Sequence, residues 1–180
     1  MKSQSRPIAP HHTPSTPGHL RVLRVVEGTS VDGPGLRTSV YLAGCQHHCQ
    51  GCHNPQSWSP TAGTPVSTDA LMQQIAYNEA PLTLSGGDPL AQPQGVLELV
   101  RRVKTELGLN IWCYTGYTWE QIVKRPELMA VMKYIDVLVD SPFVLAERDT
   151  SLRFRGSRNQ RLIDVPHTLL KGNHITLYSS

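Results

Sequence analysis

The chain has 180 residues and a mass of 19.9 kDa, which suits one domain, because domains usually hold about 100 to 200 residues. A formal net charge of +3 and a pI near 8.7 are too small to indicate a nucleic-acid partner, which requires a concentrated basic face. No apolar run approaches the ~18 residues of a membrane span, and no basic-then-apolar export signal opens the chain. We therefore expect a cytoplasmic protein with no membrane contact, whose four cysteines stay reduced.

Residues 1–19 contain four prolines and almost no apolar side chains. Such a segment buries too little surface to offset the entropy lost on ordering. We predict a disordered leader over 1–19 and one folded domain over 20–180. His11, His12 and His19 are candidate metal ligands in the leader, but a solvated tail is the expected state.

Strands and helices alternate through the rest of the chain. Capping residues and apolar residues at helical spacing indicate the helices, and short apolar or β-branched runs between turn signals indicate the strands. In chain order the sequence predicts strands over 20–27 and 38–44, a helix from Ser67 or Thr68, a strand within 81–88, a helix over 96–107, a strand within 109–116, a helix from Pro126 to about 135 and a strand over 136–140.

This alternation favours an α/β fold with a mainly parallel sheet. A closed eight-unit barrel takes ~250 residues, whereas about 160 remain here after the leader. We therefore predict an open, partial (β/α) barrel of about five or six units. Ligands of such sheets bind beyond the carboxyl ends of the strands, where Cys45 and the pair Gly86–Gly87 are expected to lie.

Three cysteines, Cys45, Cys49 and Cys52, have the spacing C-x3-C-x2-C directly after the second strand. Thiolates select zinc or iron–sulfur clusters, and Gly44 and Gly51 give the loop the freedom to bring them together. Three ligands would leave one iron of a 4Fe-4S cluster open, whereas electron-transfer clusters are usually closed by a fourth cysteine.

A zinc site completed by His47, His48 or His53 is the alternative for this loop. Zinc sites of that class usually carry paired C-x2-4-C knuckles, and the sequence has no second knuckle. Cys113 lies inside a predicted strand, where we expect a small buried apolar residue and not a ligand.

The cysteine spacing after the first strands of a partial barrel resembles the radical S-adenosylmethionine (SAM) enzymes. The resemblance implies a 4Fe-4S cluster held by Cys45, Cys49 and Cys52, with the amino and carboxylate groups of SAM on the fourth iron. It also implies reductive cleavage of SAM to methionine and a 5′-deoxyadenosyl radical, a chemistry that belongs to the cofactor while the protein positions it.

The stretch LSGGDPL resembles the GGE motif of that family, which binds the amino group of SAM, with aspartate in place of glutamate. Gly51 stands where many members carry an aromatic residue against adenine, so stacking must come from elsewhere, with Tyr114, Tyr117 and Trp119 as candidates. The SAM contacts implied by the resemblance are Gly51, Cys52, His53, Gly86, Gly87 and Asp88.

The stretches SVDGPGLRTSVYLAGC and CHNPQSW resemble the glycyl-radical activating enzymes within that family. LSGGDPL, WCYTGYTWE, DVLVDSPF and RFRGSRNQR resemble the activators of anaerobic (class III) ribonucleoside-triphosphate reductase more than those of pyruvate formate-lyase. The resemblance covers residues 20 to about 165. It implies formation of a glycyl radical on the large subunit of the reductase, an electron donor such as flavodoxin or ferredoxin, and no nucleic acid. An activator of another glycyl-radical enzyme, or a small-molecule enzyme related to 7-carboxy-7-deazaguanine synthase, remains open.

Two charged features have two interpretations each. Asp140 ends a predicted strand and either contacts SAM or caps the strand end. An arginine-rich run either meets phosphate, RNA or an acidic partner, or forms a solvated loop paired with local carboxylates. Its arginines are Arg153, Arg155, Arg158 and Arg161, and the nearby carboxylates are Glu147, Asp149 and Asp164.

Overall fold

A computed structural model describes residues 18–179 of the chain. Most of the predicted leader, with His11 and His12, lies outside the described residues, whereas His19 already belongs to the first strand. Within 18–179 no helix is both long enough and apolar enough to cross a bilayer.

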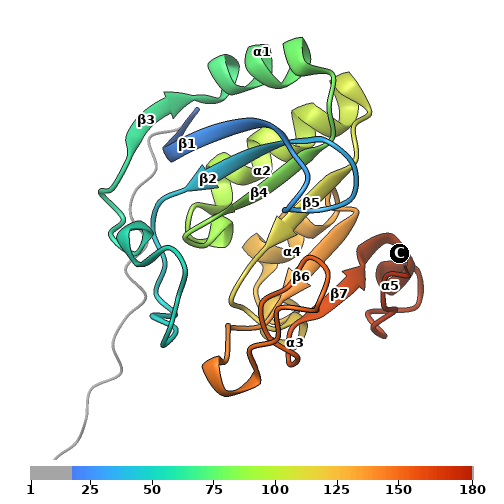
Figure 1. The fold of residues 1–180 in the computed structure, drawn as a ribbon. Coiled ribbons are helices and arrows are strands. Elements are labelled where there is room, and N and C mark those ends of the chain that lie inside the picture. Colours follow the sequence, from blue (N-terminus) through green and yellow to red (C-terminus); the bar gives the residue numbers. More distant parts are fainter. Residues whose placement is uncertain (1–17, 180) are drawn as a thin grey trace, which may run out of the picture.

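Seven strands form one open mixed sheet (Figure 1). The four central strands run parallel, and the strands on both sides of them are antiparallel to their neighbours. In spatial order the strands are β3 (Thr64–Ser67), β1 (His19–Thr29), β2 (Arg37–Leu42), β4 (Leu82–Gly86), β5 (Ile111–Tyr114), β6 (Val137–Asp140) and β7 (Arg161–Asp164). The open sheet is therefore confirmed, and the parallel arrangement holds for its centre only.

Five α-helices connect or follow these strands, and α1, α2 and α4 lie on one face of the sheet (Figure 1). Ser67 caps α1 by accepting a hydrogen bond from the Ala70 amide, and Pro93 and Pro126 open α2 and α4, as their fixed φ favours. The helices are α1 (Thr68–Asn78), α2 (Pro93–Arg102, continued by a π-helical turn over Val103–Leu107), α3 (Trp119–Ile122), α4 (Pro126–Met132) and α5 (Val165–Leu170).

Four short elements, β3, α3, β7 and α5, were not predicted from the sequence. Each has six residues or fewer, too short for a clear periodic pattern. A signal for α3 exists, because Thr118 and Gln121 form a capping box around its first turn. The strand β7 depends on tertiary pairing, since it bonds to β6 on one side and to the C-terminal tail at Leu177 on the other.

Two cores of different size lie on the two faces of the sheet. The helix-covered face holds the larger one, which includes Ile111 and Cys113 of β5. Cys113 is fully buried there, as predicted for a small apolar residue. The opposite face holds a smaller cluster around Trp112, against which Tyr114 and Phe154 pack. Successive side chains of β5 therefore point alternately into the larger and the smaller core.

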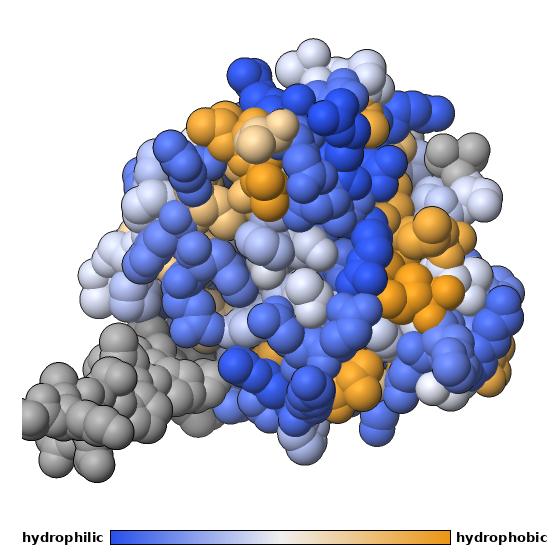
Figure 2. Space-filling model, turned by 90° about the horizontal axis from the view of Figure 1, so that it is seen from below, coloured by the Kyte–Doolittle hydropathy of each residue, from blue (hydrophilic) through white to orange (hydrophobic). Residues whose placement is uncertain are grey.

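The four parallel strands all end at the same edge of the sheet, and the loops that follow them gather there (Figure 1). Seen from that side, the surface is mostly hydrophilic, with apolar residues in separate patches (Figure 2). The loops span residues 43–63, 87–92, 115–118 and 141–160. The predicted cluster ligands and SAM contacts all lie in or directly before these loops.

Candidate metal centre

The three-cysteine loop, residues 44–55, is attached at its base to two neighbouring segments. The amides of Gly44 and Cys45 donate to the carbonyls of Ser57 and Trp58 over 2.8 and 3.1 Å. The carbonyl of Gly44 in turn accepts the amide of Asp88 over 2.7 Å. The loop therefore leaves β2 in a defined direction, alongside the turn that follows β4.

Backbone amides act on all three thiols of the loop. All three thiols are free and partly exposed. The Asn54 amide donates to the sulfur of Cys52 over 3.4 Å. The backbone amides of His47 and His48 lower the pKa of the Cys45 thiol, and that of Phe143 lowers the pKa of the Cys49 thiol. Amide hydrogen bonds to cysteine sulfur tune iron–sulfur centres, so this donor set fits a cluster bound through three thiolates.

Two of these thiols, Cys45 and Cys49, have a raised pKa and hold their protons more tightly than a free cysteine. Burial raises the pKa of the Cys45 thiol to about 11, in spite of the two amides that face it, and the charge of Asp88 raises it further. Burial also raises the pKa of the Cys49 thiol. A positively charged group at the loop would instead lower the pKa of these thiols, because it stabilises the thiolate form, which is the form that binds metals.

The three histidines of the loop are engaged with other side chains. His47 Nε2 lies 2.7 Å from Asp88 Oδ2, His48 packs 4.8 Å from the Trp58 ring, and His53 lies 5.7 Å from the Phe143 ring. Within residues 18–179, no three His, Cys, Asp or Glu side chains lie close enough together to hold one metal ion, and this includes the three cysteines of the loop. In this arrangement the loop supplies no histidine as a fourth zinc ligand.

The predicted SAM contacts fall into two groups around this loop. Gly86 and Gly87 lie at the end of β4 against its base, and the Gly87 amide donates to the Leu42 carbonyl over 2.7 Å. Gly86 has a φ of +106°, and a Cβ there would stand 2.4 Å from the Leu42 amide nitrogen, so only glycine fits. Gly51 and His53 instead lie against Leu145 and Phe143 of the 141–160 loop.

Asp88, the last residue of the glycine motif, is 1% exposed, and its carboxylate faces the protein. Besides His47, its donors are the Leu90 amide, the Thr115 hydroxyl and the Gly116 amide. The first of these bonds caps the short 3-10 turn Pro89–Ala91. Sequence reasoning placed Asp88 at the site but missed Thr115 and Gly116, whose only signal is the turn-forming pair after β5.

The three candidate aromatic residues lie in different places. Trp119 is buried in the helix-side core and donates from its indole nitrogen to the Asn173 carbonyl over 3.2 Å. Tyr117 meets the His47 ring edge-on at 4.7 Å. Tyr114 packs against the smaller cluster on the opposite face, where its hydroxyl donates to the Phe154 carbonyl over 2.9 Å. Of the three, Tyr114 alone lies on the face of the sheet that α1, α2 and α4 leave uncovered.

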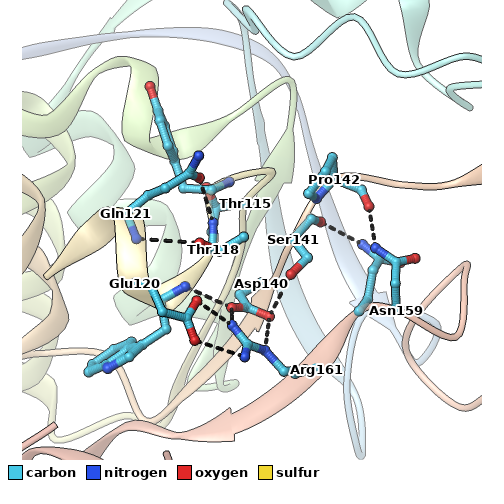
Figure 3. A network of polar contacts seen from close by, with 12 residues as sticks. Thr115, Thr118, Glu120, Gln121, Asp140, Ser141, Pro142, Asn159 and Arg161 are labelled. Atoms are coloured by element: carbon cyan, nitrogen blue, oxygen red, sulfur yellow. Dashed lines mark hydrogen bonds and ion pairs between the residues drawn. The ribbon is translucent and has the colours of Figure 1, made fainter. Parts of the chain in front are cut away.

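Asp140 lies at the centre of a polar network at the end of β6 (Figure 3). Its carboxylate is fully buried and accepts the Trp119 amide at 2.8 Å, the Ser141 hydroxyl at 3.1 Å and the Arg161 guanidinium at 2.5 and 3.0 Å. Arg161 also pairs with Glu120 at 3.0 Å. These contacts favour the strand-end cap over a SAM contact for Asp140.

The other arginines of the run also contact groups within their own segment. Arg155 donates to the Gln160 carbonyl over 2.7 Å, Arg158 lies 3.9 Å from Asp149, and Arg153 stacks 5.1 Å from the Phe154 ring centre. Of the carboxylates expected to pair with this run, only Asp149 does so among the ion pairs of the described residues. The run therefore folds the 141–160 loop on itself, and Arg153 and Arg158 stay exposed.

Comparison with known proteins places the site in a wider context. Residues 31–163 match the family model of a 4Fe-4S single cluster domain. A protein of Vibrio cholerae is 40% identical over 139 residues, which cover 72% of this chain and 88% of the relative. Relatives from Escherichia coli K12 (40% over 141 residues, 72% and 89% covered) and Enterobacteria phage T4 (34% over 140 residues, 73% and 86% covered) are also similar. All three are named anaerobic ribonucleoside-triphosphate reductase-activating protein.

Proposed function

This chain belongs to the family of anaerobic ribonucleoside-triphosphate reductase-activating proteins, and we propose that it is a radical SAM activase that forms a glycyl radical on the large subunit of that reductase. The observation that carries the proposal is the three-cysteine loop within the matched 4Fe-4S domain. Backbone amides act on each of its thiols, and the loop holds no fourth cysteine.

The cluster ligands in this proposal are Cys45, Cys49 and Cys52. SAM would lie against Gly51, Cys52, His53, Gly86 and Gly87, with Asp88 beside them at the end of the glycine motif, the set that the motif resemblance implies. When bound, the cluster and SAM together supply one-electron cleavage of SAM and abstraction of hydrogen from carbon. The chain's own part is to hold the thiolates, to keep water from them and to place the partner's glycine.

Placement is decisive for such a reaction, because a misplacement of about 1 Å can cost ~100-fold in rate. The loop edge of an open sheet suits a protein substrate, since a glycine-bearing segment can approach from outside, whereas a closed barrel would enclose a small molecule. We further propose that the sheet curves as a partial barrel around this opening. The mostly hydrophilic surface there is consistent with a partner that binds and leaves (Figure 2).

The proposed setting follows from the chemistry of the site. An electron donor such as flavodoxin or ferredoxin would reduce the cluster. The cytoplasm is the proposed compartment, because free thiols such as these four stay reduced there. The segment ahead of β1, which begins at His19, is proposed as a leader outside the folded domain.

The test begins with anaerobic purification and reconstitution, followed by iron, sulfide and zinc analysis. We expect about four irons and four sulfides per chain, and SAM cleavage under a strong reductant. Mixing this protein with the reductase, SAM and reductant should then produce a glycyl signal in the electron paramagnetic resonance spectrum. The matched control is Cys45→Ala, which should abolish the signal, beside Cys113→Ala, which should not.

Three results would contradict the proposal in different ways. One zinc per chain with no sulfide would favour a zinc module. SAM cleavage without a signal on the reductase would remove the reductase as substrate. A signal on pyruvate formate-lyase instead would favour the activator of another glycyl-radical enzyme.

A further inference from the structure

The Asp88 carboxylate has no acceptor site left for a ligand. It accepts the Leu90 amide at 2.9 Å, the Thr115 hydroxyl at 2.9 and 3.0 Å and the Gly116 amide at 3.1 Å, and His47 Nε2 lies at 2.7 Å. An ionised carboxylate offers about four lone-pair sites. Four protein donors fill them, and the side chain is shielded from solvent.

These donors come from three different connections. His47 belongs to the three-cysteine loop after β2, Leu90 to the turn after β4, and Thr115 and Gly116 to the turn after β5. One buried carboxylate thus links the ends of three parallel strands. Hydrogen bonds to an ionised acceptor are stronger than neutral ones, so the bond between His47 and Asp88 is a strong side-chain attachment of the loop.

The His47 ring lies in a closely fitting space. A Cβ on Gly116 would stand 2.4 Å from His47 Cδ2, although the φ of Gly116 is outside the left-handed region. Glycine is therefore required at 116 by space and not by backbone conformation. Tyr117 packs edge-on against the same ring, its hydroxyl accepts the side-chain amide of Gln46, and Arg125 lies 4.9 Å above its ring. The loop residues 46 and 47 are held from two directions.

We propose that Asp88 is a positioning residue that braces the three-cysteine loop through His47, and that its carboxylate does not bind the SAM ammonium. The role of this brace in binding the cluster rests on the proposed function. Because the brace consists only of protein groups, it holds His47, two residues after Cys45, in place before cluster or cofactor arrives. The base of the loop is then ordered in advance, and binding has less ordering energy to supply.

Hydrogen–deuterium exchange on the reduced, metal-free protein tests the brace without any loaded enzyme. Asp88→Asn keeps the shape but replaces one oxygen acceptor by a donor, and Gly116→Ala displaces the His47 ring with all charges retained. Both should speed exchange of the bonded loop amides by ~10-fold or more, as expected when a buried charged hydrogen bond is lost. Gln50→Ala, an exposed change in the same loop, should leave the exchange unchanged.

A second readout separates positioning from SAM binding. At limiting iron, Asp88→Asn should bind less cluster, while the loaded fraction binds SAM with wild-type affinity. Wild-type exchange in both variants would overturn the proposal, and so would full cluster content with SAM affinity reduced by tenfold or more. Hydrogen exchange in α2 reports whether each variant is folded. If Asp88→Asn unfolds the protein, the exchange of the loop amides in Gly116→Ala tests the proposal instead. Failure to bind any cluster would refute the proposed function but leave the exchange result standing.

Discussion

Replacing Asp140 should destabilise the fold, and the cost can be worked out from its partners. Asp140→Ala removes the acceptor of the buried Trp119 amide, and an unsatisfied buried donor costs ~1–3 kcal/mol. It also breaks the pair with Arg161. Losing one partner of a fully buried ion pair costs ~3–5 kcal/mol. Arg161 is 31% exposed and keeps its pair with Glu120, so breaking the pair with Asp140 contributes far less than that to the loss of stability.

The expected total for Asp140→Ala is about 3 kcal/mol in the free energy of unfolding. For a domain of this size, ~2–4 °C of Tm per kcal/mol then gives a Tm lower by ~6–12 °C. Asp140→Asn keeps one oxygen acceptor and should lose about half as much. The assay is urea unfolding of the metal-free protein, followed by circular dichroism. Glu106→Ala is the control, because its solvent-exposed pair with Arg102 contributes little to stability.

The strand-end cap would be refuted by a wild-type urea midpoint in both Asp140 variants. Unchanged stability together with weakened SAM binding by the loaded protein would show that the carboxylate serves the ligand instead. A loss of stability with SAM binding retained is the expected outcome.

Three further predictions concern the cluster, the glycine turn and the charge network. Alanine at any one cysteine of the three-cysteine loop should remove nearly all reconstituted iron and sulfide, whereas Cys113→Ala should keep both and cost only ~1 kcal/mol for a small cavity; iron loss in the latter would mean a fourth ligand. Gly86→Ala, with its strained φ and backbone clash, should lower the free energy of unfolding by more than ~2 kcal/mol, and an unchanged urea midpoint would contradict this. Arg161 lowers the pKa of Glu120 from 4.5 to about 2, so this carboxylate stabilises the fold above about pH 4.5 and loses that effect as the pH falls toward 2. Glu120→Gln should therefore lower the Tm at pH 7 by no more than ~2–4 °C, with a difference that disappears in acid; a constant difference would argue against the pair.

Elements with long periodic patterns were predictable from the sequence. The apolar spacing of the second helix and the short buried strands placed β4, β5, β6, α1, α2 and α4 at or near their observed positions. The missed elements β3, α3, β7 and α5 are short, and the two strands among them depend on pairing with distant segments. The strand β7 is an example, since it lies in the arginine-rich run and exists only between β6 and the C-terminal tail.

The sequence by itself determined which chemistry the site offers, since cysteine spacing and the glycine motif depend only on residue type and order. Tertiary structure alone decided which of these side chains remain free to bind a ligand. Asp88 has the residue type of an ammonium ligand, yet its carboxylate is filled by His47, Thr115 and Gly116 from other loops. Hydrogen-bond capacity is limited, and partners up to 41 residues away in the chain use it up. No local pattern records that competition, which exists only once the strand ends meet.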